Sequence, residues 1–186
     1  LLKHQFTALA KADVNEPVHL FGKKSVYEWA GIYTRGPGRY MLVAHISFTF
    51  QRTRVHEDKI VIAYTLNCYL DHVLIWETDM LSKVENMIAG SQKTSPTGKY
   101  TVMIVGDKDK VVFEKNTDLL DTMKGAHEEV IDKITEVLEQ YGKCECEIVG
   151  KTIFIKSTVA ASRTELERML QIENHLFILL EEQLIN

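Results

Sequence analysis

The stretch YMLVAHISFTFQRTRVHEDKIVIAYTLNCYL, residues 40–70, decides the fold of this 186-residue chain. Even positions from 40 to 50 hold Tyr, Leu, Ala, Ile, Phe and Phe, while the odd positions include His, Ser and Thr. This period of two places the aromatic side chains on one face of a strand. Residues 60–70 repeat the alternation. The stretch therefore predicts two antiparallel strands, joined by an exposed polar hairpin loop at 52–59.

Apolar runs on both sides of this stretch extend the predicted sheet. Further strands are predicted at 18–21, 26–33, 73–76, 100–105 and 110–114. The segment Arg35-Gly36-Pro37-Gly38-Arg39 is predicted as a turn, because Gly tolerates a positive φ and Pro fixes its own φ. The remaining patterns predict a short helix at 80–88, a loop at 91–98 and a hairpin tip at 106–109.

The last third of the chain changes to a helical period. Apolar residues from Leu119 to Tyr141 form one stripe of a helix that ends at Gly142. A β-hairpin is predicted over 146–156, with Gly150-Lys151 as its turn. Ser162-Arg163-Thr164-Glu165 matches a capping box at the start of a final helix. The fold class expected is α+β, a mostly antiparallel β-sandwich or sheet followed by a C-terminal helix–β-hairpin–helix unit.

No flexible linker separates these two parts. We therefore expect a β-rich, sandwich-like lobe at 1–115 and a helix-hairpin-helix lobe at 116–186 that share one core. A length of 186 residues suits a single domain.

Composition excludes several classes of protein. The chain has 22 Lys+Arg and 26 Asp+Glu, a net charge of −4, and 45% hydrophobic residues, which argues against disorder and collagen. We expect no transmembrane helix and no signal peptide, because no apolar run is long enough. Three cysteines, an odd count, fit reduced thiols and synthesis in the cytoplasm.

Charge and apolar residues are distributed unevenly, which favours an assembly role. Residues 1–60 carry nine basic and five acidic side chains, whereas residues 117–147 carry three and nine. Opposite charges of this kind steer association between copies or with a partner protein. The stretch 176–180 is apolar on all sides of the final helix and needs cover. The interface candidates are Leu176, Phe177, Ile178, Leu180 and Leu184.

The leading hypothesis is accordingly a non-catalytic structural or assembly protein that acts through homo-oligomeric or partner contacts. Residue 1 is Leu rather than Met, which suggests processing, a trimmed chain, or a non-standard start codon as in a phage or viral reading frame. More specifically, we expect a virion component, such as a capsid, decoration or tail protein. No cofactor and no metal ligand are predicted.

Residues 36–48, GPGRYMLVAHISF, carry one resemblance. A Pro-Gly-x-Tyr segment followed by an alternating strand resembles jelly-roll domains of the tumour-necrosis-factor type and viral fibre and decoration domains. The resemblance implies a β-sandwich that serves as a trimeric binding or assembly module.

Nucleic-acid binding is the alternative hypothesis. Guanidinium groups that alternate with aromatic rings can pair phosphate contacts with base stacking. The candidates near the Gly-Pro-Gly turn and at the far end of the following strand are Tyr33, Arg35, Arg39, Tyr40, Arg52 and Arg54.

A phosphoesterase activity is the third hypothesis. His45-Ile46-Ser47 resembles half of the paired His-x-Ser motifs of the 2H phosphoesterases, but the chain has no second such motif. Cys144-Glu145-Cys146 could begin a zinc site, yet no second pair of ligands lies at a matching spacing. We therefore expect core or interface thiols there and no enzyme.

Overall fold

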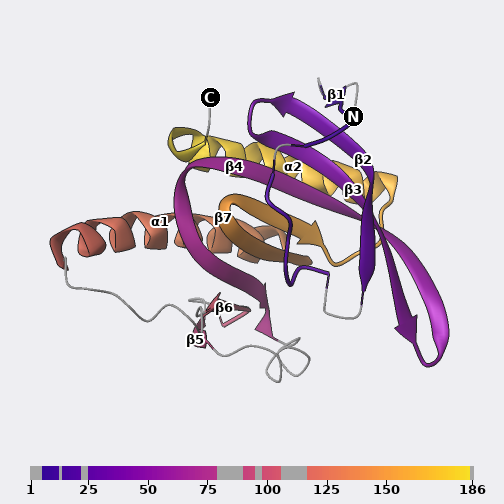
Figure 1. Cartoon of the computed structure of the whole chain (residues 1–186), viewed down its shortest axis with the longest axis horizontal. Coiled ribbons are helices and arrows are strands. Elements are labelled where there is room, and N and C mark those ends of the chain that lie inside the picture. Colours follow the sequence, from indigo (N-terminus) through magenta and orange to yellow (C-terminus); the bar gives the residue numbers. More distant parts are fainter. Residues whose placement is uncertain are drawn as a thin grey trace.

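A computed structural model describes residues 6–12, 14–21, 25–78, 90–94, 98–105 and 117–184. One antiparallel sheet and two helices make up these parts of the chain, which confirms the α+β class (Figure 1). The elements are β1 (Thr7–Ala8), β2 (Val26–Gly36), β3 (Arg39–Phe50), β4 (Thr53–Glu77), β5 (Gly90–Thr94), β6 (Tyr100–Val105), α1 (Thr117–Tyr141), β7 (Cys144–Ser157), α2 (Arg163–Leu180) and a short 3₁₀ turn, η3 (Glu181–Gln183).

The sheet is built around β4. Its seven strands have the order β1-β2-β3-β4-β6-β5, and β7 pairs with β4 outside that path. The first part of β4 pairs with β3, and its last residues pair with β6. In the described residues this is one continuous sheet, whereas the resemblance of residues 36–48 implied the two sheets of a jelly roll.

Two tight turns join β2, β3 and β4. Gly36 and Gly38 have φ values of 149° and 64°, so the predicted Gly-Pro-Gly turn is confirmed. The loop predicted at 52–59 is wrong, because only Gln51 and Arg52 form the turn and the ladder continues through Phe50↔Thr53. Polar residues on both faces hid these strands from the sequence pattern, since the hairpin projects beyond the helices (Figure 1) and residues 51–54 at its tip are exposed.

The hairpin predicted at 146–156 is part of a single strand, β7. It pairs with β4 from Ile75↔Cys146 to Val61↔Lys156, with register shifts on both sides of the pair Leu70↔Gly150. Gly150 has a φ of 60°, which glycine adopts without strain. The Gly-Lys pair thus bends one strand, and β4 bends with it (Figure 1).

Two other sequence predictions are wrong at least in part, and three lie outside the described residues. Residues 18–21 are not a strand, because their backbone N–H groups serve a buried carboxylate described below. Part of the predicted loop at 91–98 is β5, which pairs with β6. The helix predicted at 80–88, the hairpin tip at 106–109 and the strand at 110–114 lie outside the described residues.

Both predicted C-terminal helices are confirmed. Gly142, with a φ of 65°, ends α1 and donates its N–H to the carbonyl of Leu138 at 2.7 Å. Ser162 caps α2, because its Oγ accepts from the N–H of Glu165 at 3.1 Å. The carboxylate of Glu165 does not complete the capping box but binds Ser157 and Arg168.

Apolar side chains form a core on each face of the sheet. The larger core joins the helices to β4, β6 and β7, and its buried members include Tyr64, Ile75, Ile134, Ile155 and Met169. The smaller core lies on the opposite face, where the N-terminal segment contributes Ala12 and Leu20. The N-terminal segment therefore acts as the cover of the second face.

Among the described residues, neither helix is long and apolar enough to cross a membrane.

Candidate metal centre

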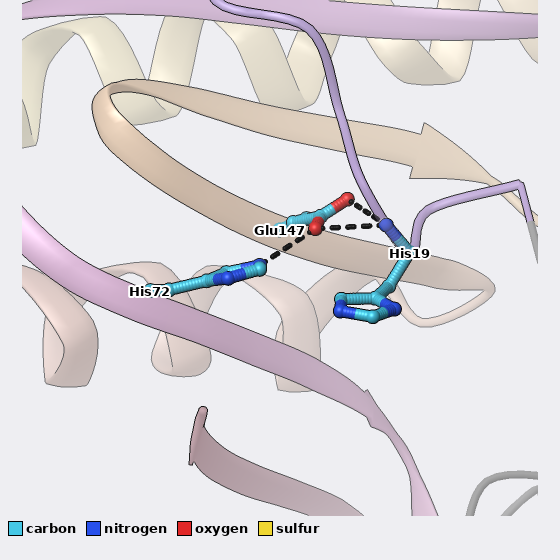
Figure 2. A group of neighbouring side chains, drawn as sticks. All are labelled: His19, His72 and Glu147. Atoms are coloured by element: carbon cyan, nitrogen blue, oxygen red, sulfur yellow. Dashed lines mark hydrogen bonds and ion pairs between the residues drawn. The ribbon is translucent and has the colours of Figure 1, made fainter. Parts of the chain in front are cut away.

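Three polar side chains meet where β4 and β7 bend. His72 comes from β4, Glu147 from β7, and His19 from the N-terminal segment that crosses this part of the sheet (Figure 2). Glu147 lies opposite Leu74 in the ladder, and His72, two residues from Leu74, shares its face of β4. The bend thus brings together residues that are far apart in the sequence.

Glu147 is the centre of this cluster, and its side chain is 0% exposed. Its carboxylate accepts from the backbone N–H groups of Val18 at 3.1 Å, His19 at 2.9 Å and Leu20 at 2.8 Å. A buried carboxylate is costly unless hydrogen bonds replace its water. These three donors supply that replacement and fix the orientation of both oxygens.

The two imidazoles lie beside this carboxylate. His72 Nε2 is 2.8 Å from Glu147 Oε1, and the rings of His19 and His72 stack with centroids 5.3 Å apart. One ligand atom from each of the three residues lies within 4.8 Å of the other two.

The donor set has a clear chemical preference. Two imidazoles and one carboxylate suit zinc and other divalent first-row transition metals. Hydrogen bonds that hold a ligating carboxylate in place are a usual feature of such sites. In the described parts of the chain, the only ion pair of Glu147 is with His72, so the buried charge lacks a Lys or Arg partner.

The six nucleic-acid candidates do not form one surface. Arg35 and Arg39 turn toward α2, where both contact Glu173. Tyr33 packs against the larger core, and Tyr40 is buried in the smaller one. Arg52 and Arg54 are exposed at the other end of β3, about 35 Å away for a strand of 12 residues.

The five interface candidates differ in how far they are buried. Leu176, Leu180 and Leu184 are buried in the larger core. Phe177 is partly buried, and the guanidinium of Arg39 lies 3.4 Å from the centre of its ring. Ile178 is 71% exposed. Of the five candidates, therefore, only Ile178 is left largely exposed by its own chain.

His45 belongs to a second histidine cluster, on the β3–β4 hairpin. Its Nδ1 lies 2.7 Å from Asp58, while Ser47 Oγ lies 2.8 Å from His56 Nδ1, and the two rings stack at 5.5 Å. The sequence pointed to His45 and Ser47 but not to His56 and Asp58, because those two were placed in a loop. The cluster is open to solvent.

Cys144 and Cys146 are both buried in the larger core, which confirms the expectation of core thiols. Burial raises the pKa of the Cys144 thiol to about 11 despite the nearby guanidinium of Arg168. A neutral buried thiol is a poor metal ligand.

Sequence reasoning missed His19, His72 and Glu147, since no local spacing joins them. One signal was available, because His72 and Glu147 each interrupt an apolar strand run with a polar side chain. Polar residues inside buried strands need a partner, and they often mark a site.

No protein-family model, curated protein or solved structure matches this chain.

Proposed function

We propose that the protein binds one divalent first-row transition-metal ion through His19, His72 and Glu147. The observation that carries the proposal is the fully buried carboxylate of Glu147, which has two imidazoles within 4.8 Å and no Lys or Arg partner among the described residues. A cation at this point would neutralise Glu147 and tie the N-terminal segment to the bend of β4 and β7. The role is structural, in keeping with a non-catalytic protein.

A proton on His72 is the competing source of positive charge. It would stabilise the contact between His72 and Glu147, but it would not need His19. The two possibilities therefore differ in how they respond to loss of His19.

The test is calorimetric titration of the purified protein with Zn²⁺ at neutral pH. We expect about one ion per chain, and His19→Ala and His72→Ala should each weaken binding about tenfold or more. His45→Ala and His56→Ala are matched controls, because they remove stacked histidines from the other cluster. Equal binding by all four variants would refute the site, and so would the absence of binding by the wild-type protein.

Self-association is a second candidate function, and Ile178 supports it. This side chain is 71% exposed within the apolar stretch 176–180, so a partner surface that covered it would gain free energy from burial of its apolar area. A virion component built from repeated copies is the form that we propose. Sedimentation over a concentration series tests it, since a monomer at every concentration would exclude self-association.

A further inference from the structure

The tip of the β3–β4 hairpin offers basic and apolar side chains to solvent. Phe50 is 59% exposed, and Arg52 in the turn next to it is also exposed. Arg54, which lies opposite Thr49, is exposed on the other face of the hairpin. The two-residue turn and the paired ladder below it define the backbone of the tip. Residues 49–54 contain no acidic side chain. This tip suits an acidic partner that also offers an apolar contact.

The C-terminal end of α2 is a surface of the opposite kind. Ile178 is 71% exposed, and Glu181 and Glu182 in η3 are exposed beside it. No basic residue lies in the last turn of α2 or in η3. The end of a helix carries partial negative charge, so two further carboxylates there favour a cationic partner.

These two surfaces lie at opposite ends of the molecule. The hairpin tip and the last turn of α2 point away from each other along the long axis (Figure 1). One chain cannot bring them together, whereas a second copy can. A contact between two different surfaces joins copies head to tail and builds rings or chains.

We infer that the hairpin tip of one copy docks on the C-terminal end of α2 of a second copy. Phe50 packs against Ile178, Arg52 in the turn pairs with Glu181 or Glu182, and Arg54 adds positive charge from the other face of the tip. The inference rests on self-association, the second function proposed above, and adds the two surfaces that carry it. Charge complementarity and one exposed apolar side chain on each surface favour a second copy of the chain as the partner.

Charge reversal tests the contact by sedimentation of the full chain. We expect R52E/R54E and E181R/E182R each to raise the dissociation constant about tenfold or more relative to the wild-type protein. A chain with all four substitutions should associate again, because the charges are complementary once more. E128R/D132R is the matched control, since it reverses two exposed acids on α1 and should leave association unchanged.

The outcomes distinguish failure of this docking inference from failure of the proposed self-association on which it rests. A wild-type protein that stays monomeric overturns both. A protein that associates with or without these charges, or that responds to the α1 control instead, overturns the inference alone. Loss of binding to a single-stranded oligonucleotide in R52E/R54E, with no change in mass, would assign the tip to nucleic acid and also overturn it.

Discussion

Arg39 and Glu173 form a buried ion pair that joins the first hairpin to the last helix. Arg39 Nη2 lies 2.6 Å from Oε1 of Glu173, whose side chain is 1% exposed. Arg35 approaches the other carboxylate oxygen at 3.4 Å, and the Tyr64 hydroxyl donates to the backbone carbonyl of Glu173 at 2.5 Å. The guanidinium groups that suggested nucleic-acid binding thus neutralise a carboxylate inside the fold.

Arg39→Ala should lower the free energy of unfolding by about 3 kcal/mol, because it leaves the buried charge of Glu173 poorly compensated. Arg35→Ala should cost less, since Arg35 is more exposed and lies farther from the carboxylate. Urea titration measures both. Arg163→Ala is the control, with an effect within about 0.5 kcal/mol, since its side chain is 92% exposed. Equal effects for Arg39 and Arg163 would contradict the role of the ion pair.

Zn²⁺ should stabilise the wild-type protein against heat. Ligand at about a hundred times its dissociation constant adds about 2.7 kcal/mol when it binds only the folded state. Thermal scans with and without Zn²⁺ measure the gain. His72→Ala should lose it, whereas His56→Ala should keep it, and an equal rise in Tm for both variants would count against the metal centre.

Stability should fall in acid partly through Glu165. Burial disfavours the charged form of this carboxylate, but hydrogen bonds from Arg168 and Ser157 and the charge of Arg168 outweigh burial, so its pKa is lowered from 4.5. A lowered pKa contributes stability above about pH 4.5 that is lost as the pH falls through the folded value. Glu165→Gln should therefore flatten the decline of the urea midpoint below pH 5, and Ser157→Ala should flatten it less. An unchanged slope in Glu165→Gln would show that other groups cause the decline.

Thiol reagents should distinguish the three cysteines. The pKa of Cys144 is raised to about 11 by burial, and that of Cys146 is also raised, so neither is a thiolate at pH 8. Cys68 is partly exposed. Mass spectrometry after brief labelling at pH 8 should find Cys68 modified alone, and labelling in urea should find all three. Rapid native labelling of Cys144 would mean that the larger core opens readily.

The alternating pattern at 40–50 and 60–70 predicted β3 and β4 because a period of two has a direct physical cause in strands. The capping residue Ser162 and the terminating Gly142 were equally predictable, since both act on neighbouring backbone groups. The bend at Gly150 was not predictable. Gly-Lys is common in turns, and only the partner strand β4 decides that the chain bends there without reversing.

Local sequence patterns could not predict the candidate metal site, for a similar reason. His19 and Glu147 meet because the N-terminal segment crosses the bend, which is a property of the whole sheet. Arg35 and Arg39 looked free in the sequence because nothing near them is acidic, and their partner Glu173 is more than a hundred residues away.

The pairing of β4 with β7 also governs the order in which the chain can fold. Its partners are separated by roughly 70 to 95 residues, and contacts this distant in sequence slow folding. During synthesis, β2, β3 and β4 can form their ladder first, but one edge of β4 stays without its β7 partner until the ribosome has released residues 144–157. A slow final step, in which the late strand enters beside β4 and α2 closes over it, follows from this topology.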